Sequence, residues 1–217
     1  MFAFPEKASF GKAVPKNLIY SQARPSKKVK ALFVSQVEEI VWAYKLSPET
    51  LNLPAKGGYS EIQIFEIRLR TGKLDSAVLT AIDKAVPYPI IFRLLYKKRI
   101  QLVAAYKRPA ADGTKNWVID GQFGTGWLDA GAEGSLLPVA LNIKALYEQM
   151  MLPIIGKEPQ PDEALDALVQ RLDLIRKKER ELQQLQSRLK RSKQFNRKVE
   201  INAEIRTLSA ELERLNA

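Results

Sequence analysis

The 217-residue sequence contains no cysteine and no histidine. Without cysteine there can be no disulfide, no thiolate nucleophile and no zinc–cysteine site. Without histidine the chain lacks the usual general base, the commonest metal ligand and every serine–histidine triad. Any catalysis would have to use carboxylates, lysine, tyrosine or a carboxylate-bound magnesium ion. We therefore expect no cofactor.

Long apolar runs are missing as well. The longest uncharged run, residues 134–143, is about half of the roughly 20 apolar residues that a spanning helix needs. The first residues, MFAFPEKASFGK, lack the apolar core of a signal peptide. We therefore expect a cytoplasmic protein without a membrane partner.

Proline and glycine are absent from the last quarter of the chain. All 12 prolines and all 11 glycines lie at or before Pro161. The run GKEPQP, which ends there, should stop a helix, because proline has no amide proton and disfavours helix at the residue before it. The sequence predicts a core domain over residues 1–156, a linker over 157–161 and a helical segment over 162–217.

Helix and strand patterns alternate in the core domain. Apolar residues at helical spacing predict helices over residues 29–46, 74–86 and 137–151. β-branched residues in near alternation predict the first strand over residues 61–70. Its phase slips at Phe65 and Glu66, which a bulge or a strand buried on both faces would explain.

The clearest β-hairpin lies just after the middle helix. Apolar residues alternate over residues 90–96 and again over 100–106, with a polar KKR turn between them. Residues 115–119 and 122–128 predict one or two further strands. The order of elements predicts an α+β fold, a mixed β-sheet with helices covering one face.

Two apolar stripes run along the C-terminal segment. Ile201, Ile205, Leu208, Leu212 and Leu215 follow the spacing of a heptad seam. A second stripe comprises Leu165, Leu168, Leu172, Ile175, Leu182, Leu185 and Leu189. A single helix over this segment would be about 84 Å long and would need another chain to cover it. A turn near residues 192–196 lets the halves cover each other and predicts an antiparallel hairpin of coiled-coil type.

The sequence is strongly basic. It has 35 Lys and Arg against 24 Asp and Glu, a net charge of +11, which favours an acidic partner such as DNA or RNA, or serves solubility alone. Two groups of basic residues are candidate contacts with nucleic acid or a protein partner. The first group, around the predicted β-hairpin, is Arg93, Lys97, Lys98, Arg99, Lys107 and Arg108. The second, near the predicted helical turn, is Arg188, Lys190, Arg191, Lys193, Arg197 and Lys198.

Aromatic residues stand among these cations. Tyr96 and Tyr106 lie in the first group and Phe195 in the second. Basic residues next to aromatic rings suit a nucleic-acid surface, whereas lysines at a turn or a sheet edge also prevent aggregation. Phe195 predicts either a contact with a base or a partner groove, or a cap that closes the seam at the turn.

No metal or nucleotide motif stands out. A magnesium nuclease would carry an acid on one strand and a Glu-x-Lys or similar on the next, but the chain offers only Glu66-x-Arg68, with Asp120, Asp83, Glu61 and Asp129 as further carboxylates. The glycine-rich run FGTGWLDAGAEG lacks the Gly-Lys-Ser/Thr of a phosphate loop. We therefore predict neither catalytic residues nor a metal site.

Several stretches carry a family resemblance. WAYKLSPETLNL, EIQIFEIRLR, IDKAVPYPIIFRLLY, AAYKR and KQFNRKVEINAEI resemble a bacterial family known as domain of unknown function 4391. The resemblance implies gene neighbourhoods with helicases and DNA methyltransferases of restriction and phage-defence cassettes. It implies no catalytic residue.

Charge, absences and resemblance together predict a non-catalytic accessory or adaptor subunit of a bacterial DNA-targeting complex. It would dock on a protein partner such as a helicase, nuclease or DNA methyltransferase, with the helical hairpin as the docking or DNA-contacting arm. Two alternatives stay open: a carboxylate- and magnesium-dependent nuclease, and a stand-alone nucleic-acid-binding module.

Overall fold

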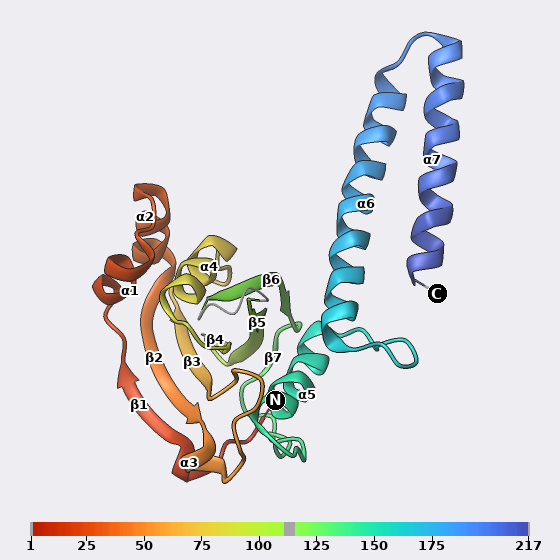
Figure 1. Cartoon of the computed structure of the whole chain (residues 1–217). Helices are drawn as coiled ribbons and strands as arrows, with labels where there is room; N and C mark the ends of the chain where they lie inside the picture. Colours follow the sequence, from red (N-terminus) through yellow and green to blue (C-terminus); the bar gives the residue numbers. More distant parts are fainter. Residues whose placement is uncertain (1, 111–115, 217) are drawn as a thin grey trace. The chain divides into compact units, whose positions relative to one another are not determined.

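The computed structural model describes residues 2–110 and 116–216 (Figure 1). The chain divides into two compact units, Met1–Glu158 and Pro159–Ala217. The first unit contains a β-sheet with helices, and the second contains two helices. None of the described helices combines the length and the apolar character needed to cross a membrane.

A mixed sheet runs through the first unit. The strands are β1 (Ser9–Ala13), β2 (Val37–Leu46), β3 (Ile62–Leu69), β4 (Ile90–Tyr96), β5 (Arg99–Pro109), β6 (Trp117–Gly124) and β7 (Leu128–Asp129). Strands β1 to β6 lie in sequence order, and β7 pairs with β5. β3 and β4 are parallel, and the other paired strands are antiparallel. The α+β prediction is confirmed.

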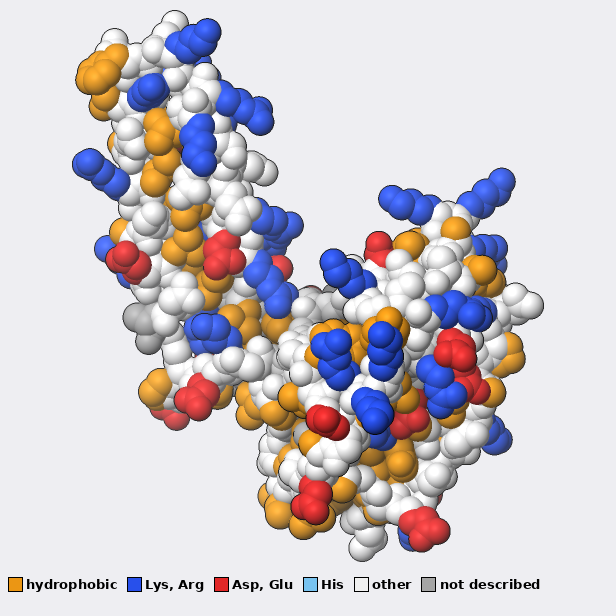
Figure 2. Space-filling model, turned by 180° about the vertical axis from the view of Figure 1, so that it is seen from behind, with side chains coloured by type: hydrophobic (Ala, Val, Ile, Leu, Met, Phe, Trp, Pro, Cys, Tyr) orange, Lys and Arg blue, Asp and Glu red, His pale blue; other side chains and the backbone are white. Residues whose placement is uncertain are grey.

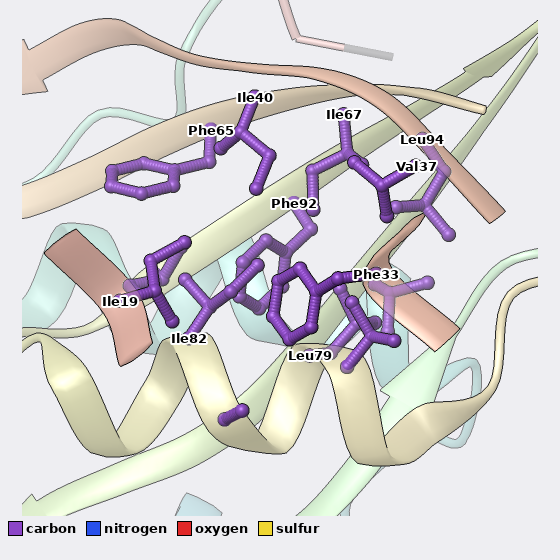
Figure 3. Packing of buried hydrophobic residues seen from close by; sticks show 14 of the residues in the cluster. Ile19, Phe33, Val37, Ile40, Phe65, Ile67, Leu79, Ile82, Phe92 and Leu94 are labelled. Atoms are coloured by element: carbon purple, nitrogen blue, oxygen red, sulfur yellow. The ribbon is translucent and has the colours of Figure 1, made fainter. Parts of the chain in front are cut away.

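Helices pack on this sheet. They are η1 (Glu6–Ala8), α1 (Lys16–Ala23), α2 (Lys27–Gln36), α3 (Pro48–Leu51), α4 (Ser76–Ala85) and α5 (Ile143–Ile155). Figure 3 shows side chains of α1, α2 and α4, such as Ile19, Phe33 and Ile82, facing Phe65 and Phe92 of the sheet. α5 contacts β5 and β6.

The helix predicted over residues 29–46 is half wrong. α2 ends at Gln36, and the chain continues as β2 between β1 and β3. The burial of β2 recurs at every third residue, at Val37, Ile40, Ala43 and Leu46. Two register shifts against β3 interrupt the alternation and produce this spacing. A bulged strand therefore imitated the periodicity of a helix.

β3 is confirmed as a strand, although it is the third in the chain and not the first. The four residues from Ile62 to Phe65 are all buried, so the strand is covered on both faces there. A register shift also lies opposite, between Trp42 and Tyr44 of β2. The extra residue at this shift, Ala43, belongs to β2 and not to β3, so burial on both faces is the predicted cause that explains the phase slip.

The other predictions for the first unit differ mainly at their bounds. α4 and the antiparallel β4–β5 hairpin are confirmed. The last helix starts later than predicted, at Ile143, because the Asn142 side chain caps it by accepting from Ala145 N at 3.0 Å. It ends at Ile155, followed by Gly156 in the left-handed conformation. The strand predicted over residues 115–119 and the start of the one predicted over 122–128 form a single strand, β6, and only Leu128 of the second prediction lies in β7. Residue 115 lies outside the described residues.

The second unit is a helical hairpin, as predicted. α6 (Leu165–Arg191) and α7 (Phe195–Asn216) are joined by a three-residue turn at 192–194. Leu185 packs with Ile201 and Leu208, and Leu182, Leu189 and Ile205 flank this cluster. Near the open end, Arg171 Nη1 donates to Leu215 O at 3.0 Å. The coiled-coil description of this pairing stays a prediction.

Candidate functional site

Two cations of the first predicted group are paired inside the sheet. Arg93 Nη1 lies 2.7 Å from Glu66 Oε1 on the neighbouring strand, and the Arg93 guanidinium lies over the ring of Phe4. Arg108 Nε lies 2.8 Å from Asp120 Oδ2. Each arginine therefore has a carboxylate of its own and presents less net charge than the sequence suggests.

Lys107 is not on the surface at all, which corrects its place in the predicted basic group. Its side chain is completely buried, with Nζ 3.0 Å from Asp83 Oδ1. Nζ also donates to the carbonyl oxygens of Asp83, Val86 and Tyr88 at 2.8 to 3.0 Å. Burial raises the pKa of the Asp83 carboxyl to about 6 and lowers the pKa of Lys107, while the pairing opposes both changes.

The location of Lys107 had a signal in the sequence. It follows Val103 and Ala105 at period two, and Val103 belongs to the core beneath α4. The alternation of β5 therefore turns Lys107 toward the core. What the alternation could not supply is the partner, since Asp83 comes from α4, 24 residues earlier.

The remaining cations of this group form a small exposed turn. Lys97, Lys98 and Arg99 are exposed at the tip of the β4–β5 hairpin. Lys97 has a φ of 54° and holds its Nζ 5.4 Å from the centre of the Tyr96 ring. We call these three residues the strand-turn cluster.

The second predicted group is concentrated at the end of the helical hairpin. Arg188, Lys190, Arg191, Lys193, Arg197 and Lys198 are all exposed, and no ion pair involves them within the described part of the chain. Residues 182–199 contain no acid. Figure 2 shows Lys and Arg side chains around this end of the hairpin. We call these six residues and Phe195 the hairpin tip.

Phe195 does not close the seam of the hairpin. It is the first residue of α7 and is 77% exposed, and Val199, one turn later, is 53% exposed. The buried cluster of the hairpin begins below them, at Leu185 and Ile201. Of the two predictions for Phe195, the outward contact agrees with this position and the cap does not.

The carboxylates considered for a nuclease are dispersed. Glu66, Asp120 and Asp83 face Arg93, Arg108 and Lys107, and Glu61 lies 3.3 Å from Lys45. Asp129 accepts from the backbone N–H of Gly131. Over residues 2–110 and 116–216, no three acidic side chains come together in a way that could hold a metal ion.

A third basic region extends over the N-terminal elements from η1 to α2. Between Glu6 and Glu38 the sequence contains no acid, and it contains seven Lys and Arg, namely Lys7, Lys12, Lys16, Arg24, Lys27, Lys28 and Lys30. The sequence reveals this run, because no acidic residue occurs between Glu6 and Glu38. The sequence does not reveal that α1 and α2 lie beside α4.

Comparison with known proteins gives one match. The family model described as Domain of unknown function (DUF4391) matches residues 2–212. The chain belongs to this family. The match spans both units of the DUF4391 protein, so the helical hairpin is part of the family pattern. No match was found among curated proteins or solved structures.

Proposed function

We propose that this DUF4391 protein is a cytoplasmic, non-catalytic accessory subunit of a bacterial DNA-targeting complex, and that the hairpin tip docks it on its protein partner. The observation that carries the proposal is the hairpin tip, where six exposed cations without an ion-pair partner in the described chain surround an exposed phenylalanine. The resemblance to the family implies a setting of restriction or phage defence. It also implies the kind of partner, a helicase or a DNA methyltransferase.

The charge of the hairpin tip favours an acidic partner. Six like charges on adjacent turns repel one another, and salt weakens this repulsion only partly within a Debye length of about 8 Å. An acidic surface placed against the tip would remove the repulsion and speed the encounter. The charges of the tip therefore favour association with an acidic partner more than they favour the stability of the hairpin.

Packing between the two helices holds the hairpin tip in place. Leu185, Ile201 and Leu208 are buried between the two helices just below it. Further down, Lys178 forms an ion pair with Glu211 of the other helix. Because this packing already orders the tip, less conformational entropy is lost when the tip binds a partner.

Exposed apolar atoms support a protein as the partner. Phe195 and Val199 are one helical turn apart, so they share one side of α7 at the tip. Aromatic anchors that enter an apolar pocket contribute strongly to protein interfaces, and arginines around them form the polar rim. We propose that Phe195 enters such a pocket and that Arg191 and Arg197 face acidic residues around it.

An apolar segment of the first unit supports a second protein contact. Leu136, Val139 and Leu141 are 86%, 93% and 85% exposed, and the run from residue 134 to 143 carries no charge. Large apolar side chains exposed together mark interaction surfaces more often than they mark solvent-facing ones. A subunit that remains in a complex would keep them covered.

The carboxylates support a role without catalysis. A nuclease needs two or more acids that converge on a metal ion, whereas Glu66, Asp120 and Asp83 lie on different elements, each beside a cation of the chain. This arrangement is the reason to rank the nuclease below the accessory subunit.

The test is co-purification of the full-length protein from its native locus with the products of neighbouring genes. Arg191→Glu, Lys193→Glu and Arg197→Glu together should lower the yield of the helicase or methyltransferase at least tenfold. The matched control reverses Lys97, Lys98 and Arg99 of the strand-turn cluster, which changes the net charge by the same amount. Equal losses in both variants, or no loss in the tip variant, would place docking elsewhere.

A further inference from the structure

The cations of the N-terminal basic region are of two kinds. Some contact other parts of the protein, and others are exposed to solvent. Lys16 belongs to the structure, since its Nζ donates to Phe33 O at 3.0 Å and to Val37 O at 2.7 Å, at the C-terminal end of α2. Lys30 holds its Nζ 5.3 Å from the centre of the Tyr20 ring. Arg24, Lys27 and Lys28 are exposed, and within the described residues no carboxylate pairs with them. Figure 2 shows Lys and Arg side chains projecting from the end of the first unit where α1 and α2 lie in Figure 1.

One of these exposed cations, Arg24, lines a groove, and Lys27 and Lys28 follow it closely in the chain. One wall comes from the connection between α1 and α2, with Arg24, Ser26 and Val29, and the other wall comes from α4. The α4 wall consists of Ser76, Ala77, Thr80, Ala81 and Lys84. At a rise of 1.5 Å per residue, this wall is about 12 Å long. The groove therefore has one cation on each wall, contributed by segments that are 60 residues apart.

The hydroxyl groups of the groove can still donate. The Ser26 oxygen accepts from Val29 N at 3.4 Å, which leaves its own proton available. Ser76 uses its backbone oxygen as an acceptor, and its hydroxyl has no partner within the described chain. Thr80, by contrast, donates to Ser76 O at 3.0 Å. With Arg24 and Lys84, the groove thus presents two hydroxyl donors and two cationic donors.

Few negative groups oppose an anion there. The acid next to the groove is Asp75, the cap of α4, and its Oδ1 already accepts from Ala77 N at 2.9 Å. Asp83, on the same helix, is buried and faces Lys107. Among the described residues, no acid lines the groove itself. A ligand made of linked anions with many acceptor oxygens fits these donors.

We infer that this groove and the adjacent Lys27 and Lys28 form a binding surface for the phosphate backbone of duplex DNA. Duplex DNA carries about one charge per 1.7 Å of axis, twice the density of one of its strands, so it gains more than a single strand from a cluster of cations. None of the described residues that line the groove is aromatic, so the bases of a single strand have no ring there on which to stack. Binding is insensitive to sequence, since these side chains reach phosphates and none is placed to read a base edge.

This surface adds a second role, DNA binding, to the proposed function. The inference rests on the proposed function only for the choice of DNA as the acidic ligand. The hairpin tip would hold the partner protein, and the groove would hold the DNA on which that partner acts. The two roles have separate readouts. DNA affinity is measured on the purified full-length chain, and docking is measured by co-purification.

The experiment is fluorescence anisotropy of a labelled DNA duplex with the full-length protein over a range of salt concentrations. Arg24→Glu, Lys27→Glu and Lys84→Glu together should weaken binding at least tenfold at low salt. The slope of log affinity against log salt should become shallower by about 3, at roughly 0.9 for each lost phosphate contact. The tip variant Arg191→Glu, Lys193→Glu, Arg197→Glu has the same charge change and should retain most of the affinity.

Three results would overturn the inference. They are an unchanged affinity in the groove variant, an equal loss in the tip variant, and tighter binding to a single strand or to polyglutamate than to the duplex. Circular dichroism should confirm that the groove variant remains folded, because the three side chains are exposed and lie outside the core. The milder variant Ser76→Ala with Lys84→Gln should reduce affinity in the same direction, which separates donor loss from charge reversal.

Discussion

The Nζ of Lys107 on β5 lies 3.0 Å from the Oδ1 of Asp83 on α4, and neither side chain is accessible to solvent. Hydrogen bonds surround the pair. The hydroxyl of Tyr147 accepts from Lys107 N at 2.9 Å and donates to Ala105 O at 3.1 Å, and the hydroxyl of Tyr59 donates to Lys107 O at 3.0 Å. These bonds join the sheet to the C-terminal end of α4 and to α5. A buried polar centre therefore fixes the helices that cover the sheet.

Replacing Lys107 should be strongly destabilising. Lys107→Met leaves Asp83 and three carbonyl oxygens without their donor, and breaking a buried pair on one side costs about 3–5 kcal/mol. Urea unfolding of the full chain measures the loss. As the control, Lys177→Met breaks the exposed pair with Asp173 and should cost no more than about 1 kcal/mol. Similar losses of unfolding free energy in the two variants would mean that breaking the buried pair costs no more than breaking the exposed pair.

The same pair should make stability depend on pH. Because burial raises the pKa of Asp83 in the folded chain to about 6, the folded state holds a proton there that the unfolded chain releases at a lower pH. The contribution of Asp83 is thus fully present below pH 3.8 and is lost as the pH rises through about 6.

The measurement compares the wild type with Asp83→Asn, which does not titrate at this position. As the pH rises from about 4 through about 6, the unfolding free energy of the wild type should fall relative to that of the variant, because the folded chain releases the Asp83 proton over this range. Above that range the difference should level off. A difference that stays constant from pH 4 to pH 7 would show that Asp83 remains ionised in the folded chain.

Core and tip positions of the helical hairpin should respond differently to truncation. Leu208→Ala removes a side chain from the buried cluster and should cost about 2–4 kcal/mol. Phe195→Ala, at the exposed tip, should change stability by less than about 0.5 kcal/mol and still weaken co-purification with the partner. Thermal unfolding followed by circular dichroism separates the two. A large loss of helicity in Phe195→Ala would restore the prediction that Phe195 caps the seam.

Substitution of the candidate nuclease carboxylates should affect stability alone. Glu66→Gln removes the carboxylate that faces the mostly buried Arg93 and should cost about 1 kcal/mol. Asp120→Asn removes a half-exposed pair with Arg108 and should cost less. Incubation of plasmid DNA with the wild type and magnesium or manganese should give no cleavage. Divalent-dependent cleavage that either substitution abolishes would promote the nuclease alternative.

The sequence alone determined the elements whose pattern is local. The alternation of residues 90–106, the helical spacing of α4 and the two apolar stripes of the C-terminal segment all predicted the observed structure. In each case the period of the apolar residues equals the period of the element that buries them, and no register shift interrupts the pairing of β4 with β5. The turn between α6 and α7 was also predictable, because two stripes of different phase cannot share one seam.

Only the tertiary structure decided the elements and contacts that depend on distant partners. β2 imitates a helix because its pairing with β3 introduces two register shifts, which no single strand encodes. Lys107 is inside because Asp83 and the carbonyl oxygens at the end of α4 compensate its loss of hydration. The groove beside α4 exists because Arg24 and Lys84, far apart in the chain, border the same surface. Contacts between distant segments bury the charge of Lys107 and assemble the charged groove. The local periodicity of the sequence does not predict such contacts.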